Sequence, residues 1–313
     1  MVKRIGQRDI LRELEPAVAG ELNRHERMTK DWHPHDYVPW SDGKNFAYLG
    51  GQDWEPEQSK LGKAARAAMY VNLLTEDNLP SYHREISHVF GRDSAWGSWV
   101  DRWTAEEGRH GIAMRDYLIV TRAIDPVELE QARMQQVIGG YESGDKTPLE
   151  AVVYVTMQEL ATRIAHRNTG LESKKDGDEL ADKLLGRIAA DENLHMIFYR
   201  NIGTAALEIA PNEMMKAITK EIDGFVMPGA TTIPNFGRKA IQIADAGIYD
   251  LQMHLQDVVV PVLKKWKIAD REDLTAEGAA ARDDLLGRVL PAKQQEAAAF
   301  AEWRASVKAK IEK

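Results

Sequence analysis

The stretch 103–110, "WTAEEGRH", places two glutamates and a histidine within about two turns of a helix. Its ending returns at 189–195 as "AADENLH", so that an acid, a glutamate and a histidine recur in the same order. A carboxylate and an imidazole three residues apart lie on one helix face and can bind the same metal ion. The spacing therefore marks Glu107 with His110, and Glu192 with His195, as two candidate ligand pairs.

By itself this motif is weak evidence. The chain has 26 Glu and 9 His, and it contains three Glu-x-x-His matches. Random placement of those residues gives about one match. The third match, Glu85 with His88, follows Arg84 and lacks the preceding acid, so we interpret it as a surface pair.

A solitary glutamate on the preceding helix distinguishes the other two pairs. Glu76 lies 31 residues before Glu107, and Glu159 lies 33 residues before Glu192. The resulting order, a glutamate and then Glu-x-x-His, occurs twice and is the ligand pattern of di-iron or di-manganese carboxylate proteins with ferritin-like bundles. For any one of these residues, a solvated glutamate or a core-filling histidine is the commoner role. For six in this order and spacing, two divalent cations that compensate four buried carboxylates are the better explanation.

Composition narrows the class of protein. The chain has 313 residues, 43% of them hydrophobic, with helix-forming residues in its periodic segments, which indicates an all-α fold. It has no cysteine, which excludes disulfides, iron–sulfur clusters and thiolate zinc sites. A net charge of −8 argues against nucleic-acid binding. No apolar run is long enough for a secretory signal or a membrane span, so we expect a cytoplasmic location.

The helical periodicity predicts one domain, 1–313, in which a ferritin-like four-helix bundle is extended by additional helices. The bundle core is expected at about 60–225, with an N-terminal wrap at 1–59 and a C-terminal helical extension at 226–313. An irregular stretch is expected at 31–56. The helices are predicted at 8–24, 61–79 up to Pro80, a short segment up to Gly91, 94–121, 126–138, 147–170, 178–204, 211–225, 235–257 and within 275–308.

Several motifs together resemble one enzyme family. "WTAEEGRHG", "MQELATRIAHRNTG", "IAADENLH" and "TEDNLPSY" are similar to segments of the soluble acyl-acyl carrier protein desaturases of the stearoyl-carrier-protein type. "DWHPHDYVP" and "PVLKKWKI" extend the resemblance to roughly residues 20–290. It implies a homodimer with a di-iron centre. The implied reaction uses O2 and electrons from ferredoxin to insert a cis double bond into an acyl chain on acyl carrier protein.

The resemblance also implies roles for individual residues. Glu76 and His110 would bind one iron, Glu159 and His195 the other, and Glu107 and Glu192 would bridge both, with manganese as an alternative metal.

Four further residues are implied around this ligand set. Thr162 matches a threonine that faces the oxygen site and helps deliver protons, whereas a helix threonine more often bonds its own backbone. Asp191 would fix the tautomer of a ligand histidine. Glu106 would do the same in the other half or be solvated. Trp32 resembles the tryptophan of the electron route, and an aromatic anchor for the irregular segment is the alternative.

The substrate and partner sites are less clearly marked. We expect an apolar tunnel lined by Met69, Trp103, Met114 and Met157, although such a stripe is more often plain core. Acyl carrier protein is acidic, so a basic docking patch is needed. Residues 24–30, Lys174 with Lys175, and Lys264, Lys265 and Lys267 are the candidates.

Three departures from the family pattern limit any transfer of chain-length or regiochemical preference. Asn193 and Leu194 stand where plant relatives carry charged residues. The stretch between Glu76 and Glu107 is shorter than in the plant enzymes, and the tail beyond 297 matches no family segment. Other functions also remain open: a hydroxylase, N-oxygenase or aldehyde-processing oxidase with the same metal centre, an iron-storage protein, and a paralogue without catalysis.

Overall fold

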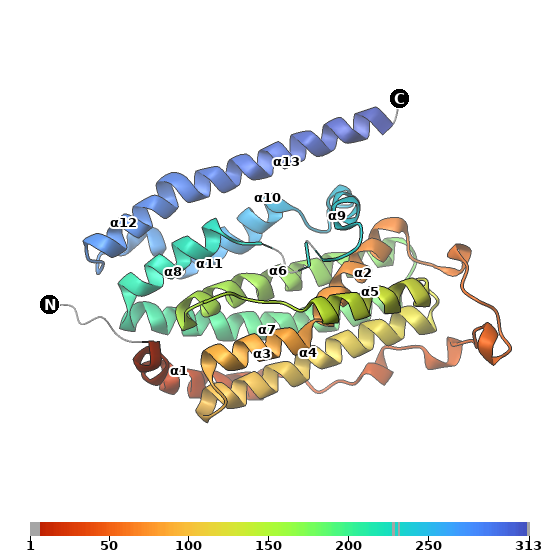
Figure 1. Ribbon diagram of the computed structural model, residues 1–313, viewed down its shortest axis with the longest axis horizontal. Helices are drawn as coiled ribbons and strands as arrows, with labels where there is room; N and C mark the ends of the chain where they lie inside the picture. The colour runs from red at the N-terminus through yellow and green to blue at the C-terminus, as the bar shows by residue number, and fades with distance from the viewer. Residues whose placement is uncertain (1–6, 227–228, 231, 312–313) are drawn as a thin grey trace.

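The computed structural model describes residues 7–226, 229–230 and 232–311, and every regular element in these ranges is helical (Figure 1). This confirms the all-α prediction. The α-helices are α1 (Gln7–Met28), α2 (Lys63–Glu76), α3 (Leu79–Phe90), α4 (Ser94–Val120), α5 (Pro126–Gly139), α6 (Pro148–Lys175), α7 (Glu179–Ile209), α8 (Pro211–Asp223), α9 (Phe236–Asp245), α10 (Leu251–Met253), α11 (Val260–Lys265), α12 (Ala276–Asp284) and α13 (Leu290–Ile311). Shorter elements are η1 (Pro34–Asp36), η2 (Trp40–Asp42), η3 (Ala47–Leu49), η4 (Pro56–Gln58), η5 (His254–Val259), η6 (Ile268–Asp270) and η7 (Leu285–Val289).

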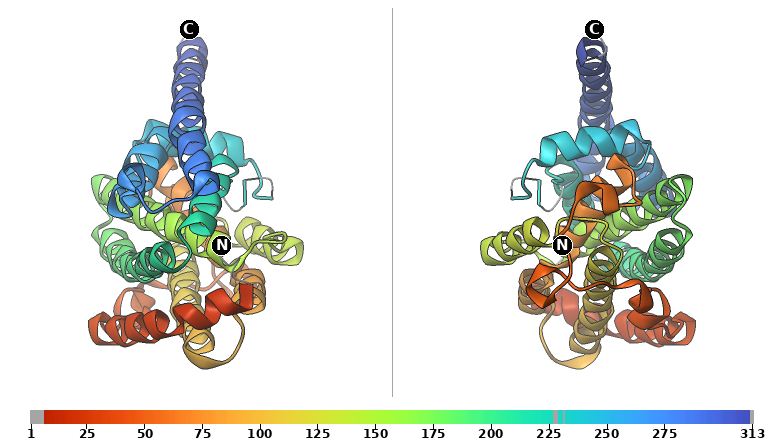
Figure 2. Two further views of the ribbon diagram at one scale, coloured as in Figure 1. Left: turned by 90° about the vertical axis from the view of Figure 1, so that its left-hand side faces the viewer. Right: turned by 90° about the vertical axis from the view of Figure 1, so that its right-hand side faces the viewer.

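Helices α2, α4, α6 and α7 form the central bundle. Helix α6 packs along α7, and α2 and α4 close the ring by packing on each other and on α6 and α7 respectively. Helix α1 lies against α4 and α7, while α8 to α13 build a layer on the other side. Helix α13 runs along the outside of this layer, and its C-terminal end stands clear of the body (Figure 2).

Local sequence signals account for several helix ends. Thr147 caps α6: its hydroxyl accepts from the Glu150 amide, and the Glu150 carboxylate accepts from the Thr147 amide at 2.9 Å. This reciprocal pair satisfies amides that the first helical turn leaves without partners. Pro80 lies in the first turn of α3, where its missing N–H costs nothing. It therefore opens α3 after α2 has already ended at Glu76.

Besides the helix end predicted at Pro80, two further predicted boundaries are wrong. Helix α6 does not end at Gly170 but continues to Lys175, because Gly170 serves helix packing: a Cβ there would meet Asp182 of α7 at 3.1 Å. The helix predicted at 235–257 is broken after Asp245. Gly247 takes a left-handed conformation, with φ of 68°, and the Asp250 side chain then caps the next helix by accepting from the Met253 amide.

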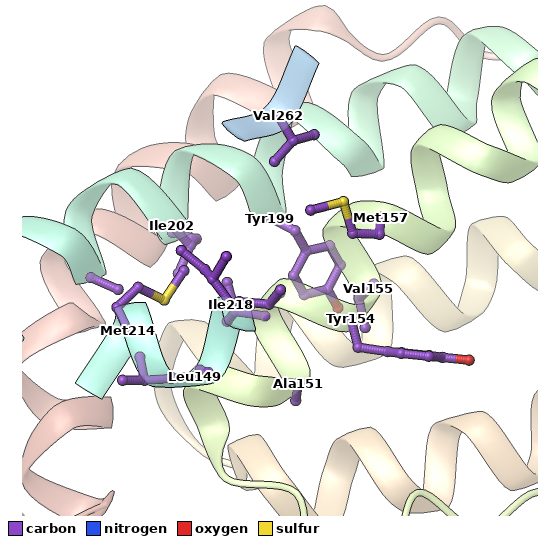
Figure 3. Close-up of a cluster of buried hydrophobic side chains, with 14 of the residues drawn as sticks. Leu149, Ala151, Tyr154, Val155, Met157, Tyr199, Ile202, Met214, Ile218 and Val262 are labelled. Atoms are coloured by element: carbon purple, nitrogen blue, oxygen red, sulfur yellow. The ribbon is translucent and has the colours of Figure 1, made fainter. Parts of the chain in front are cut away.

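The hydrophobic core consists of two clusters. One joins α1, the first half of α4, α6, the second half of α7, and α8, with Met157, Tyr199 and Val262 among its members (Figure 3). The other joins α2, the second half of α4 and the first half of α7. On both α4 and α7 the Glu-x-x-His residues lie between the segments that belong to the two clusters. The core therefore places a polar belt across the middle of the bundle.

The segment between α1 and α2 has only the four short turns η1 to η4, as expected for an irregular stretch at 31–56. Arg122 anchors it from the end of α4. Its guanidinium donates to the backbone carbonyls of Lys44, Asn45, Gln52 and Asp53. One buried side chain thus satisfies carbonyl groups that no helix or sheet would satisfy here.

Among the described residues, no helix is both long and apolar enough to cross a membrane.

The close approach of Gly203 on α7 to Trp266 gives a test of this packing. A Cβ at Gly203 would lie 2.5 Å from the Trp266 ring, whose N–H is held by the Arg200 carbonyl at 2.9 Å. We expect Gly203→Ala to lower the free energy of unfolding by about 1–3 kcal/mol, measured by denaturant unfolding. Gly186→Ala on the same helix is the matched control, because the nearest atom to its Cβ is 3.7 Å away. Equal stability of the two variants would contradict this account.

Candidate metal centre

The six candidate ligands converge in the middle of the bundle. Glu76 comes from the end of α2, Glu107 and His110 from α4, Glu159 from α6, and Glu192 and His195 from α7. None is more than 7% exposed. Their ligand atoms form two groups, each small enough to surround one metal ion. One comprises Glu76, Glu107, His110 and Glu192, and the other Glu107, Glu159, Glu192 and His195.

Two glutamates belong to both groups, and each divides its oxygens between them. Glu107 presents Oε2 to His110 Nδ1 at 3.3 Å and Oε1 to His195 Nδ1 at 2.9 Å. Glu192 presents Oε1 to His110 Nδ1 at 3.4 Å and Oε2 to His195 Nδ1 at 3.9 Å. Glu76 and Glu159 each approach one of the two candidate ligand histidines, His110 and His195 respectively. The arrangement has two halves, joined by two shared carboxylates.

The outward nitrogen of each histidine faces a further carboxylate. His110 Nε2 lies 3.4 Å from Asp191 Oδ2, and His195 Nε2 lies 2.9 Å from Glu106 Oε2. Both carboxylates are buried, at 1% and 4% exposure. A carboxylate accepts a hydrogen bond, so each Nε2 carries a proton, and Nδ1 is the atom that each ring presents to the four glutamates. Burial alone would lower the pKa of His110 and His195, but hydrogen bonds to the surrounding carboxylates raise it well above its usual range, so a metal ion would displace a proton from Nδ1. Neutral imidazole with a free lone pair is the form that binds metal.

Strong donors keep these two carboxylates ionised. Burial would raise the pKa of Glu106, but hydrogen bonds from His195 and His25 hold it far below its usual range. Burial would likewise raise the pKa of Asp191, and hydrogen bonds from His110 and Trp32 hold it lower. Arginines one turn earlier on the same helices, Arg102 and Arg187, pair with Glu106 and Asp191.

Glu76 and Glu159, which each face one of the two ligand histidines, also have fixed hydrogen-bond partners. Trp103 Nε1 donates to Glu159 Oε1 at 2.9 Å. His166 Nε2 donates to Glu76 Oε1 at 2.9 Å, and its Nδ1 accepts from Asn72 at 3.3 Å. Burial lowers the pKa of His166 to about 4, which keeps its ring neutral near pH 7. Four of the six candidate ligands are thus held by a partner on the side away from the cluster.

The residues fit a pair of divalent cations. Glu107 Oε1, Glu192 Oε1, His110 Nδ1 and His195 Nδ1 are buried and make no well-oriented hydrogen bond among the described residues, although Glu107 Oε1 and His195 Nδ1 lie 2.9 Å apart. Burial and the neighbouring Glu107 raise the pKa of both Glu76 and Glu159 well above the usual range. Unpartnered buried acceptors and crowded carboxylates are costly unless positive charge compensates them. Carboxylate oxygens with imidazole nitrogen are donors that suit iron or manganese.

Metal removal is therefore expected to destabilise the protein. Ions that bind only the folded chain add about 2.7 kcal/mol per site at a concentration one hundred times the dissociation constant. We expect the thermal unfolding midpoint to fall when the ions are chelated and to recover when ferrous iron is restored without oxygen. An unchanged midpoint, with chelation verified by metal analysis, would contradict a bound metal pair.

Thr162 lies beside this cluster. Its hydroxyl is 3.1 Å from Glu192 Oε2 and equally close to the Glu159 carbonyl, so it has both a backbone and a side-chain partner. It lines a small cavity over the ligands, together with Thr75, Glu76, Trp103 and Glu159 among others.

Of the four residues expected to line a substrate tunnel, one borders a cavity at the ligands and three do not. Trp103 lines the cavity over the ligands and a second one beyond it. Met69, Met114 and Met157 line neither of these cavities, nor the large cavity on the far side of α2. They are at most 1% exposed and belong to the two core clusters. A methionine stripe at helical spacing is here part of the packed interior.

The remaining predicted residues are placed as follows. Trp32 Nε1 donates to Asp191 Oδ2 at 2.7 Å, and the Arg109 guanidinium lies 4.5 Å from the centre of the Trp32 ring. The third motif takes no part in the cluster: Glu85 binds Ser143, and His88 is exposed. Of the basic docking candidates, Lys175 pairs with Glu172 and Arg24 with Glu21, while Lys264, Lys265 and Lys267 are exposed.

Residues 6–313 match the family model described as fatty acid desaturase. The chain belongs to the fatty acid desaturase family. The match confirms the resemblance found in the motifs and extends it past residue 297, where no family segment had been identified. It also confirms that this desaturase is an enzyme of the oxidoreductase class.

Named relatives agree with this assignment. The putative acyl-[acyl-carrier-protein] desaturase DesA1 of Mycobacterium tuberculosis is 56% identical over 284 residues, which cover 88% of this desaturase and 83% of the relative. The stearoyl-[acyl-carrier-protein] 9-desaturase 6 of Arabidopsis thaliana is 31% identical over 229 residues, or 69% and 59% of the two chains. The X-ray structure of putative acyl-ACP desaturase DesA2 from M. tuberculosis superposes with a TM-score of 0.71 at 33% identity, covering 84% and 96%.

Two histidines of this site did not emerge from the motif search. His166 lies seven residues after Glu159, two turns along the same face of α6, and that spacing could have revealed it. His25 continues the buried stripe of α1 that contains Leu14 and Val18. A histidine that takes an apolar position on such a stripe is a signal of a buried polar partner.

Proposed function

We propose that this desaturase inserts a cis double bond into a saturated acyl chain carried on acyl carrier protein, with O2 as oxidant and ferredoxin as electron donor. The observation that carries the proposal is the pair of buried ligand groups joined by Glu107 and Glu192. Relatives named as acyl-carrier-protein desaturases support the substrate class. Two iron ions would be held by Glu76 with His110 and by Glu159 with His195, bridged by the two shared glutamates.

The cofactor supplies the difficult chemistry: when bound, a di-iron centre provides the O2-derived oxidant needed to remove hydrogen from an unactivated methylene. The chain's own residues orient the ligands and exclude water. Trp103 and His166 hold the outer oxygens of Glu159 and Glu76, so these carboxylates keep one fixed orientation. Thr162 places a hydroxyl 3.1 Å from Glu192, where it can hold a proton beside the reacting region.

Three cavities are candidates for the acyl path. The largest, of about 370 Å³, is lined mainly by apolar side chains and includes Asn72 of α2 and Ala165 of α6. The cavity over the ligands is lined by Thr75, one turn after Asn72 on α2, and by Thr162, one turn before Ala165 on α6. A third cavity shares Tyr82, Trp103 and Gln158 with it. We infer that the acyl chain enters the large cavity, passes the ligands and ends in the third.

The electron route proposed for Trp32 has a defined geometry. The indole donates to Asp191, and Asp191 accepts from His110, so hydrogen bonds connect the ring to one half of the centre. The Arg109 guanidinium lies over the indole, 4.5 Å from its centre, and its side chain is 20% exposed. Ferredoxin as the donor, a homodimer and a cytoplasmic location stay predictions.

The decisive experiment is product analysis. We expect the iron-loaded protein, supplied with ferredoxin, its reductase, O2 and an acyl-acyl carrier protein, to yield a mono-unsaturated chain two mass units lighter. Mass spectrometry would then give the position of the double bond. A hydroxylated chain without an alkene would overturn the desaturase in favour of a hydroxylase. Many irons deposited per chain, without either product, would favour iron storage.

A further inference from the structure

The N-terminal segment contributes one donor to each half of the metal centre, and only one of these donors has a proposed role. Trp32 donates to Asp191, which holds His110. His25 lies 2.9 Å from Glu106 through its Nε2, and Glu106 holds His195. We propose that His25 is a positioning residue for the half formed by Glu159 and His195, and that it acts through Glu106. The inference rests on the two-metal centre proposed above.

Hydrogen-bond geometry defines what His25 does. Its Nε2 and that of His195 approach the same oxygen of Glu106, each at 2.9 Å, while Arg102 Nε binds the other oxygen at 2.6 Å. An ionised carboxylate offers only acceptors, so both imidazoles donate from Nε2. Three donors on one carboxylate fix its rotation. Glu106 therefore holds the His195 ring with Nδ1 directed at the bridging glutamates.

Packing gives His25 no other evident partner. The side chain is fully buried, its ring stacks on His195 at 5.7 Å, and it meets the edge of Trp99 at 5.0 Å. Its Nδ1 has no hydrogen-bond partner among the described residues. Placing a polar ring in such surroundings is costly unless the bond to Glu106 compensates it. Helix α1 brings the ring there because Leu14 and Val18, on the same face, are buried in the core.

The two halves are thus held by different parts of the chain. His25 is in α1, and Trp32 is in the irregular segment that follows it. Partners behind a metal-binding histidine typically change metal affinity by 10–100-fold when they are lost. Because His25 acts through one more residue, we expect its loss to weaken one of the two sites by about ten-fold. The site with Glu76 and His110 should keep its affinity.

A matched pair of variants tests the role of His25. His25→Leu keeps a buried side chain but removes the donor, whereas His25→Gln keeps an N–H that can reach Glu106. Each is titrated with Co²⁺ without oxygen by visible absorption, and the occupancy of each position is then read from anomalous scattering in cobalt-loaded crystals. We expect His25→Leu to lower occupancy at the Glu159/His195 position alone, and His25→Gln to restore much of it. Trp32→Phe should act on the Glu76/His110 position.

Other outcomes would overturn the proposal. Equal loss of cobalt at both positions in His25→Leu would show that His25 only anchors α1. Leu14→Ala, which loosens α1 without touching Glu106, measures the size of that anchoring effect. Full cobalt affinity in His25→Leu would show that Arg102 and His195 hold Glu106 unaided. If His25→Leu does not fold, His25→Gln is compared with His25→Asn, whose shorter side chain does not reach Glu106. Equal cobalt titrations of these two variants would overturn the proposal as well. None of these measurements involves turnover, so they are independent of the desaturase reaction.

Discussion

Glu107→Ala is expected to abolish desaturation and to deplete both metal ions, because each oxygen of Glu107 faces a different half of the centre. His195→Ala should also abolish desaturation, but it should spare the ion held by Glu76 and His110, since His195 belongs to only one of the two four-residue ligand groups. Both effects are measured by metal analysis of the purified variants and by product formation from an acyl-acyl carrier protein. The contrast in metal content separates a bridging ligand from a terminal one.

His88→Ala is the control, since His88 has the same motif spacing but is exposed on α3. It should retain full metal content and full activity. Normal metal content in both Glu107→Ala and His195→Ala would refute the assigned ligand set. Equal, partial depletion in the two variants would refute the distinction between shared and unshared ligands.

The second large effect concerns the acyl path. Ala165 lines the large cavity on α6, one turn from Thr162 at the ligands. A phenylalanine there would occupy space in a cavity of about 370 Å³ without displacing packed atoms, so the fold should tolerate it. We expect Ala165→Phe to reduce kcat/KM at least about a hundred-fold, a loss of near 3 kcal/mol in transition-state stabilisation, with unchanged iron content.

Arg163→Phe adds the same ring to the exposed side of the same helix and should leave kcat/KM unchanged. Circular dichroism and metal analysis of both variants verify that the helix and the centre are intact. If Ala165→Phe turns over normally, the acyl chain does not pass from the large cavity to the ligands, and another route must be sought.

Most of the bundle could be predicted because its signals are local. Thr147 and Pro148 mark a helix start through interactions within one turn, and α6 begins there. The convergence of the six candidate ligands was accessible for the same reason: the Glu-x-x-His spacing fixes a helix face without knowledge of the partner helices. The order of the glutamates along the chain then indicated which faces of α2, α4, α6 and α7 come together. These glutamates are Glu76, Glu107, Glu159 and Glu192. The structure brings these residues together as that order implies.

What the sequence did not reveal depends on contacts between distant segments. His25 and Glu106 are 81 residues apart, and no local pattern links them. Gly170 looks like a helix terminator, but its role follows from how closely α7 approaches. The same limit applies to Met69, Met114 and Met157. Helical spacing predicts that a side chain faces the interior, but it does not tell whether that side chain borders a cavity or packed atoms.

The two wide turns η5 and η7 are π-helical and stand directly before α11 and α13. A π-turn accommodates one residue more than an α-turn of the same length. Deleting one residue from His254–Val259 would therefore restore an ordinary helix without turning the chain that follows, because the wide turn already absorbs the extra residue. The same deletion within regular α11 would instead turn everything after it by about 100° and separate the side chains that line the hollow between Leu263 and Leu290. In a lineage of such enzymes, a residue could thus be gained or lost at a wide turn while the packing beyond it is kept.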